Sequence, residues 1–143
     1  MSSVSFARLY FNELTQEVVP FWEKYSIDKE NGGYFTCIDD QHNVFDTDKF
    51  VWLQARQQWT FATLYDRLEK KQNWIEIARS GSDFLEKYGH NGDYNWFFSL
   101  TREGRPLVVP YNIFSHTFAC MAMGKMYHIT GEDKYKTAVG QTL

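Results

Sequence analysis

The sequence predicts an all-α fold in which pairs of helices, joined by short β-hairpins, are arranged as an α/α toroid. Apolar residues recur at helical spacing in several long segments, and short stretches of strand-like composition lie between these segments. The unit of outer helix, hairpin and inner helix occurs twice along the chain. Repeated helix pairs bury their apolar faces by stacking, and a ring of such pairs closes on itself without end caps.

The first predicted helix covers about residues 6–25, where apolar side chains recur every three or four positions. Pro20 lies inside this helix, and a proline kinks or ends a helix because it has no amide hydrogen to donate. Residues 34–38 and 44–45 then predict two short strands on either side of the polar loop 39–43. We therefore expect a hairpin directly after the first helix.

The second predicted helix contains the segment KFVWLQARQQWTFATLY, residues 49–65, and continues to about Leu68. Its side chains are apolar on almost every side, which is typical of an inner helix that has protein all around it. Asp46 and Asp48 precede this segment, and we expect their oxygens to cap its first turn.

The second part of the chain repeats this order of elements. The sequence predicts a third helix over about residues 73–88 and a second hairpin with strands at 96–100 and 107–109. A fourth helix is predicted over about residues 112–129, and the start of a fifth over about 132–143. The chain ends inside the last helical pattern, before any C-cap. We therefore expect residues 1–143 to be the N-terminal portion of a longer protein; a natural short protein with a frayed end is the alternative.

The two units are related by a constant offset. The stretch YFTCI begins at Tyr34 and the stretch WFFSL begins at Trp96, so they lie 96 − 34 = 62 positions apart. The same offset aligns aromatic and apolar residues of the two inner helices: Trp52 with Phe114, Trp59 with Met121, and Tyr65 with Tyr127.

Polar residues within the apolar second helix mark a candidate site. Arg56 keeps its proton at any relevant pH, so a buried Arg56 requires an anion, several acceptors or a wet pocket. Trp52 lies one turn earlier on the same face, whereas Gln54 and Gln57 point away from that face of a regular helix. An aromatic ring beside a fixed cation suits the floor of a polar small-molecule site. The alternative is a structural arginine that pairs with an acid on a neighbouring helix.

Composition and charge exclude several classes of partner. The chain has 18 acidic and 15 basic residues, a net charge of −3, and no block of one sign, so neither nucleic acid nor an anionic membrane is an expected partner. No apolar run approaches the roughly 20 residues of a membrane span, and the N-terminus lacks the apolar core of a signal peptide. Cys37 and Cys120 form no metal-binding or disulfide-rich pattern, which favours free thiols and a cytoplasmic location.

The histidines do not predict a metal site, because none lies at metal-ligand spacing from a cysteine or carboxylate. His42 and His90 fall in loops, where a solvated imidazole is the ordinary case, and His128 lies at a helix end, where a cation suits the helix dipole. His116 is interpreted as a core or inter-helix residue, with reach into a cavity as the alternative. The acidic residues of the turns before the second helix are interpreted as capping residues rather than as glycosidase carboxylates.

Four stretches carry a family resemblance. In order they are FWEKYSIDKENGGYFTCIDD, KFVWLQARQQWTFATLY, WFFSLTREGRP and NIFSHTFACMAMGKMYHITGEDKY. Together they resemble the N-acylglucosamine 2-epimerase family, in particular its animal-type members, which are also described as renin-binding proteins. The resemblance implies an (α/α)6 barrel domain of which residues 1–143 are the N-terminal portion. It also implies interconversion of N-acetyl-D-glucosamine and N-acetyl-D-mannosamine, while related members act on cellobiose, mannose or sulfated sugars.

Such an epimerisation opens the sugar ring, removes the C2 proton and returns a proton to the opposite face. It requires two acid–base groups, for which histidine fits best, and a cation or strong donors beside the enediolate oxygen. The resemblance places the two histidines on later inner helices, beyond Leu143. It assigns Arg56 as the catalytic cation and Trp52 as a wall of the sugar pocket. Ser115 is a further substrate-lining candidate, although some family members carry a tyrosine near that position.

The resemblance also bears on cofactors and partners. The chemistry requires no cofactor, but animal-type members are linked to activation by a nucleotide such as ATP, and the sequence contains no phosphate-binding glycine loop that would support such a site. The resemblance implies an amino sugar as the substrate, and family members are often homodimers. The renin-binding description also implies a renin-like protease as a protein partner.

Two other functions stay open from the sequence: a sugar isomerase or glycoside hydrolase on the same scaffold, and a renin-binding-type interaction protein. For the 143 residues alone we expect no catalysis, because the groups for proton transfer are missing. We also expect aggregation, because apolar inner faces would be exposed to water.

Overall fold

The N-terminal part of the chain is a long helix with a local change of winding. The structure, a computed structural model, describes residues 3–110 and 113–142. It begins with α1 (Ser3–Glu13), continues through one π-helical segment, η1 (Leu14–Val18), and ends in α2 (Val19–Tyr25). Pro20 lies in the first turn of α2, where its missing amide hydrogen and its ring favour a wider turn just before it. The predicted first helix is confirmed, and the effect of Pro20 is absorbed by this π-helical segment.

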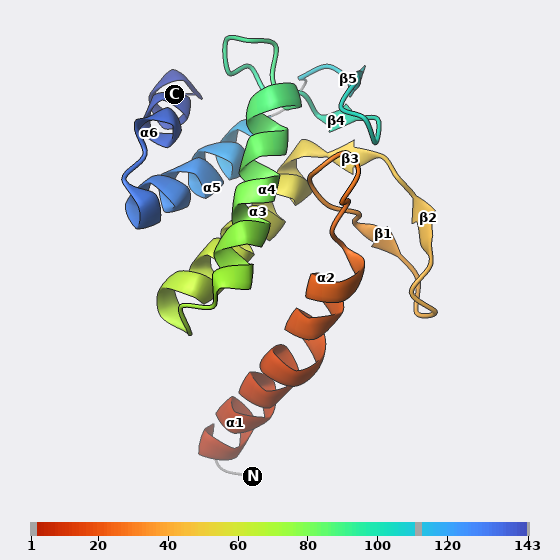
Figure 1. Ribbon diagram of the computed structural model, residues 1–143, viewed down its shortest axis with the longest axis vertical. Coiled ribbons are helices and arrows are strands. Elements are labelled where there is room, and N and C mark those ends of the chain that lie inside the picture. Colours follow the sequence, from red (N-terminus) through yellow and green to blue (C-terminus); the bar gives the residue numbers. More distant parts are fainter. Residues whose placement is uncertain (1–2, 111–112, 143) are drawn as a thin grey trace.

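The remaining helices pack around a central one. The central helix is α3 (Val51–Arg67), which packs against both α4 (Gln72–Tyr88) and α5 (Phe114–Thr130). In turn, α5 packs against α6 (Asp133–Thr142), while α1 extends beyond the rest of the molecule (Figure 1). The predicted buried stripe of α4 is present: its buried members are Trp74, Ile77, Ala78, Gly81, Phe84 and Leu85, and Tyr88 is half-buried.

Two small antiparallel sheets lie at the ends of these helices. The first is the hairpin of β1 (Cys37–Ile38) and β2 (Val44–Asp46). The second has the strand order β3-β4-β5 and consists of β3 (Lys49–Phe50), β4 (Ser99–Leu100) and β5 (Pro106–Val108). Both predicted hairpins are confirmed, and β3 joins the second hairpin to the residues that lead into α3.

The prediction that Asp46 and Asp48 cap the second helix is wrong. The helix begins at Val51, and its N-cap residue Phe50 is extended and makes no side-chain capping bond. The Asp46 carboxylate instead accepts a hydrogen bond from the Asp48 amide at 2.9 Å. The amide of Val51 donates to the Phe98 carbonyl at 3.0 Å, so pairing with the β4 region satisfies an amide at the helix start that a cap would otherwise serve.

The structure contains the predicted internal repeat. The strands β1 and β4 begin 99 − 37 = 62 positions apart, and the helices α3 and α5 begin 114 − 51 = 63 positions apart. The predicted start of the fourth helix at Asn112 lies outside the described residues. After α5, Gly131 adopts a left-handed conformation with φ of 70°, which ends that helix and allows the predicted last helix to follow as α6.

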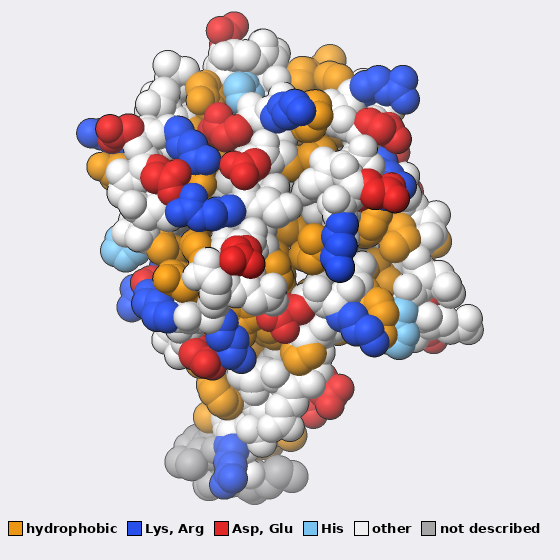
Figure 2. Space-filling view, viewed as in Figure 1, with side chains coloured by type: hydrophobic (Ala, Val, Ile, Leu, Met, Phe, Trp, Pro, Cys, Tyr) orange, Lys and Arg blue, Asp and Glu red, His pale blue; other side chains and the backbone are white. Residues whose placement is uncertain are grey.

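None of the helices in residues 3–110 and 113–142 combines the length and the apolar character needed to cross a lipid bilayer. On the face shown in Figure 2, lysine and arginine side chains alternate with aspartate and glutamate side chains, without a large area of one sign.

Candidate functional site

The helix α3 carries its polar residues on two different sides. Gln54 is fully buried, and its side-chain amide forms two hydrogen bonds with the backbone of Tyr34. The amide of Gln57 donates to the Ser26 hydroxyl. Both glutamines therefore bind the segment that follows α2. Gln54 is buried away from Arg56 as predicted, whereas Gln57 lines the same hollow as Arg56.

Trp52 and Arg56 lie together on another side of α3, and Phe118 of α5 joins them. The Arg56 guanidinium carbon lies 5.8 Å from the Trp52 ring centroid and 5.5 Å from the Phe118 ring centroid. The two rings are 5.9 Å apart, centroid to centroid. These distances are within the range of cation–π attraction. We call these three side chains the Arg56 cluster.

The expectation that Arg56 is buried is wrong for this chain. Its side chain is exposed, and within the described ranges no carboxylate lies at ion-pair distance from it. The Arg56 side chain lies beside Phe118 of α5, but neither α5 nor another described element covers it. The predicted proximity of Trp52 and Arg56 is confirmed, but their roles stay predictions.

A hollow of about 300 Å³ lies beside the Arg56 cluster, between the N-terminal helix and α3. Apolar side chains form most of its wall, and Arg56, Gln57 and Thr60 supply polar atoms along α3. The full lining consists of Leu14, Val18, Val19, Trp22, Thr36, Leu53, Arg56, Gln57, Thr60, Phe61 and Leu64. An apolar concave surface with a few polar groups is the usual composition of a small-molecule site.

Ser115 does not join the Arg56 cluster. It lies in the first turn of α5, is 1% exposed, and its hydroxyl oxygen has no hydrogen-bond partner. The structure therefore places it on a buried side of α5, while Phe118 occupies the position next to Arg56. Its assignment as a substrate-lining residue stays a prediction.

Phe118 is a site residue that the sequence reasoning missed, although a signal was present. At the 62-residue offset of the repeat, position 56 corresponds to position 118, because 118 − 56 = 62. Equivalent positions on neighbouring inner helices of a repeat protein face the same space. The offset itself could therefore have identified Phe118.

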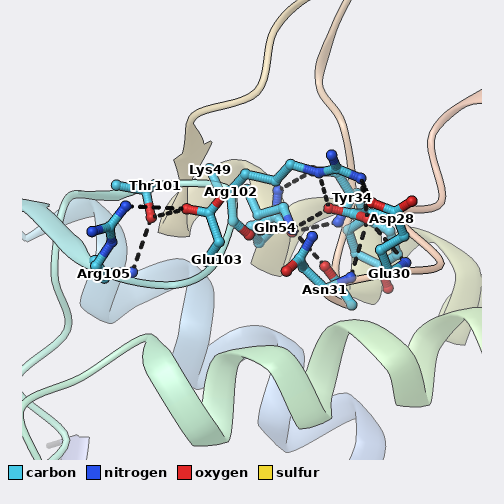
Figure 3. Close-up of polar contacts among 11 residues, drawn as sticks. Asp28, Glu30, Asn31, Tyr34, Lys49, Gln54, Thr101, Arg102, Glu103 and Arg105 are labelled. Atoms are coloured by element: carbon cyan, nitrogen blue, oxygen red, sulfur yellow. Dashed lines mark hydrogen bonds and ion pairs between the residues drawn. The ribbon is translucent and has the colours of Figure 1, made fainter.

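A buried ionic network next to the start of α3 was also missed (Figure 3). The Lys49 amine donates to the Asp28 carboxylate at 2.9 Å, to the Gly32 carbonyl at 2.6 Å and to the Arg102 carbonyl at 2.9 Å. The Arg102 guanidinium donates to both oxygens of Asp28, at 2.9 and 3.1 Å, and to Glu30 at 2.7 Å. The side chains of Asp28 and Lys49 are both fully buried.

The network shifts the pKa values of its members. Burial alone would raise the pKa of Asp28, but hydrogen bonds from Arg102 and Lys49 outweigh that effect and hold the pKa well below its usual range. Burial lowers the pKa of Lys49, and the Asp28 carboxylate opposes that change. The hydrogen bond from Arg102 to Asp28 raises the pKa of the guanidinium. The ionised forms of Asp28 and Arg102 are thus the stable ones.

The histidines lie away from the Arg56 cluster. His42 stacks on Tyr25 with 4.3 Å between ring centroids, and His90 stacks on Tyr94 at the same distance. His116 is half-buried and forms a hydrogen bond of 3.0 Å with Asn95 in the loop after α4, so its interpretation as a core or inter-helix residue stays a prediction. Over residues 3–110 and 113–142 we find no group of three histidine, cysteine, aspartate or glutamate side chains arranged to hold a metal ion.

The arrangement of repeated outer helix, hairpin and inner helix defines a protein of the α/α-barrel class, and the Arg56 cluster places a cation beside two aromatic rings on its inner helices. A family model described as N-acylglucosamine 2-epimerase (GlcNAc 2-epimerase) matches residues 33–143. The chain belongs to the N-acylglucosamine 2-epimerase family.

Curated relatives agree with this assignment. The chain is 40% identical over 124 residues to the N-acylglucosamine 2-epimerase of Homo sapiens, an alignment that covers 84% of this chain and 29% of the human protein. It is 29% identical over 122 residues to the cellobiose 2-epimerase of Bacteroides fragilis, covering 84% of this chain and 31% of that protein. The chain therefore spans about 30% of the length of these relatives.

Solved structures confirm the fold class. The cellobiose 2-epimerase of Bacillus thermoamylovorans, 27% identical, superposes with a TM-score of 0.87 over 96% of this chain and 36% of that protein. A D-mannose isomerase, 20% identical, shares the fold with a TM-score of 0.81 over 93% of this chain and 34% of that protein. The cellobiose 2-epimerases have an (α/α)6 barrel, so the predicted barrel class is correct.

Proposed function

We propose that the whole protein is a carbohydrate 2-epimerase that interconverts N-acetyl-D-glucosamine and N-acetyl-D-mannosamine. The observation that carries the proposal is the Arg56 cluster, in which a permanent cation without a carboxylate partner among the described residues lies beside the rings of Trp52 and Phe118. The relative with 40% identity is an N-acylglucosamine 2-epimerase, which supports an amino sugar as the substrate.

Arg56 acts in this proposal as an electrostatic group and not as a base, because a guanidinium does not give up its proton in proteins. Removal of the C2 proton of the open-chain sugar places negative charge on the neighbouring carbonyl oxygen. A fixed guanidinium beside that oxygen stabilises the enediolate more than it stabilises the starting aldehyde, which lowers the barrier. Trp52 and Phe118 provide apolar surfaces for the carbon-bound hydrogens of the sugar.

The groups that move the proton lie outside the Arg56 cluster in this proposal. None of the four histidines contacts the cluster, and two acid–base groups, one for each face of C2, are needed for inversion. We propose that histidines of later inner helices supply them. The 143-residue chain alone is then inactive.

Cofactors, partners and location follow the resemblance and stay proposals. The reaction requires no cofactor, and ATP is proposed only as an activator of the whole protein. We likewise propose a homodimer and a renin-like protease partner from the family resemblance. The free Cys37 and Cys120 favour a cytoplasmic location, since thiols persist in a reducing compartment.

The test follows C2 chemistry directly. The whole protein is incubated with N-acetyl-D-mannosamine in D2O, and NMR measures the formation of N-acetyl-D-glucosamine and the entry of deuterium at C2. We expect both, and we expect Arg56→Ala to lower kcat by a factor on the order of 100–1,000, the usual effect of removing one oxyanion-stabilising group.

The matched control is Arg79→Ala, which removes an arginine on α4 that pairs with Glu132 and lies away from the Arg56 cluster. This variant should keep its turnover. Absence of C2 exchange in the unmodified whole protein, with turnover of cellobiose instead, would contradict the proposed substrate. Unchanged turnover in Arg56→Ala would contradict the role of Arg56.

A further inference from the structure

Three chain segments that are distant in the sequence meet at the amine of Lys49. The amine binds Asp28 and Gly32 of the loop after α2, and it also binds the backbone carbonyl of Arg102 in the turn of the second hairpin. Lys49 itself belongs to β3 and pairs with Leu100 of β4. The residues that lead into α3 are therefore bound at once by the loop after α2 and by the turn of the second hairpin (Figure 3).

The charged pair in this network is fully enclosed. Asp28 and Lys49 have no exposed side-chain surface, and the rings of Phe84 and Phe35 lie 4.4 and 5.9 Å from the amine. All three protons of the ammonium have acceptors, so the pair is completely hydrogen-bonded. Removing two charges from water costs several kilocalories per mole, and apolar pairs of similar volume are often equally stable. Stability alone therefore does not explain an ionic pair at this place.

The network lies immediately before the residues of the Arg56 cluster. Val51, two residues after Lys49, donates its amide to the Phe98 carbonyl, and Gln54 then binds the backbone of Tyr34. Trp52 and Arg56, which both belong to α3, follow Lys49 by three and seven positions. These hydrogen bonds of Val51 and Gln54 hold one side of the first turns of α3, and the side chains of the Arg56 cluster lie on another side.

We propose that Lys49 and Asp28 are positioning residues, which fix the axial register and rotation of the first turns of α3 so that the Arg56 guanidinium is held at the reacting oxygens. This inference rests on the proposed function and adds a part of the molecule that does not touch the substrate. A displacement of a catalytic group by about 1 Å can lower a rate on the order of 100-fold, so a small rotation of α3 is sufficient for a large effect.

The first test is a thermodynamic cycle in the whole protein. Lys49→Met should lower kcat on the order of 10- to 100-fold with KM changed much less, and Lys49→Arg should restore part of kcat. In the Arg56→Ala background, Lys49→Met should lower kcat no further, because Lys49 acts through Arg56. A purely structural Lys49 would lower activity by the same factor in both backgrounds, and that result would overturn the proposal.

Lys49→Met leaves the buried Asp28 charge with one partner fewer, and this variant can misfold for that reason alone. A second variant is therefore needed to separate misfolding from the loss of positioning. The double variant Asp28→Asn with Lys49→Met removes both charges and should fold while still showing the loss of kcat. The matched control is Lys125→Met, which removes a mostly buried amine on α5. This amine pairs at 2.7 Å with Asp66, which lies near the C-terminal end of α3. The control should change stability and not kcat.

A second measurement separates this inference from the proposed function. Hydrogen exchange at the amides of residues 51–56 should become faster in the double variant than in the unmodified protein, whether or not the protein turns over an amino sugar. Unchanged protection of these amides would overturn the positioning role. Faster exchange in a protein without C2 exchange would instead sustain the positioning of α3 and contradict the epimerase.

Discussion

Gln54 and Tyr34 bind each other twice across 20 positions of the sequence. The Tyr34 amide donates to the Gln54 side-chain oxygen at 2.8 Å, and the Gln54 side-chain nitrogen donates to the Tyr34 carbonyl at 2.7 Å. Both residues are fully buried. The Gln54 side chain thus binds both backbone groups of Tyr34, as a neighbouring strand would, and it fixes the loop that contains Tyr34 against α3.

Gln54→Met should destabilise the protein strongly. Methionine has nearly the same length, but it leaves the amide and the carbonyl of Tyr34 buried without partners, which costs about 1–3 kcal/mol for each group. Urea unfolding followed by circular dichroism measures the change in the free energy of unfolding. The control Gln72→Met removes an exposed glutamine that binds Glu76, and it should change stability by less than about 0.5 kcal/mol. Equal effects of the two substitutions would contradict the importance of the Gln54 bonds.

Gly81→Ala should also destabilise the protein, although alanine normally favours a helix. A side-chain carbon at position 81 of α4 would overlap the hydroxyl group and ring of Tyr34, whose hydroxyl donates to the Ile77 carbonyl at 2.7 Å. Overpacking of this kind costs about 1–3 kcal/mol, which exceeds the gain in helix propensity of about 1 kcal/mol.

Gly140→Ala is the matched control for that substitution. Gly140 also lies in a helix, α6, and among the described residues no atom outside the neighbouring backbone of that helix lies within 4 Å of an added side-chain carbon. Its replacement should raise the free energy of unfolding by up to about 1 kcal/mol. Thermal unfolding of both variants measures the contrast, and a stabilised Gly81→Ala protein would show that Tyr34 is free to move aside.

The stability of the protein should fall in acid through Asp66. A hydrogen bond from Lys125 at 2.7 Å lowers the pKa of Asp66 from 3.8 to about 2. Above pH 3.8 the ionised carboxylate contributes its full stabilisation. As the pH falls toward 2, the unfolded chain takes up the proton first, so stability is lost in this window.

Asp66→Asn should therefore reduce the decrease in the free energy of unfolding between these two pH values, and Lys125→Met should reduce it as well. Asp28, whose pKa is also held low, contributes a separate part of the acid dependence that both variants retain. Urea titrations at a series of pH values give the slopes. Identical slopes in Asp66→Asn and the unmodified protein would show that the Lys125 contact does not stabilise the folded state.

Phe118→Ala should weaken the proposed sugar site without removing its cation. The variant loses one of the two rings near the Arg56 guanidinium, and such contacts contribute about 0.5–2 kcal/mol. We expect kcat/KM of the whole protein for N-acetyl-D-mannosamine to fall on the order of 10-fold. Phe118→Tyr, which keeps the ring, should remain close to the unmodified protein. A full effect in both variants would point to a requirement other than the aromatic face.

Sequence reasoning identified the parts of the fold that local patterns encode. Helical periodicity located all of the long helices, turn residues located both hairpins, and the offset of 62 positions indicated the repeat. The spacing of four residues between Trp52 and Arg56 was sufficient to place them on one face, because one helical turn separates them.

What the sequence by itself determined, therefore, is the set of elements and the face of α3 that carries Arg56. Only the tertiary structure decided that Lys49 begins as a strand residue buried against Asp28, that Phe118 completes the Arg56 cluster, and that Arg56 itself is exposed. The physical reason is the range of the interactions. Periodicity reports contacts within one or two helical turns, whereas Asp28, Lys49 and Arg102 meet only after loops far apart in the chain have packed together.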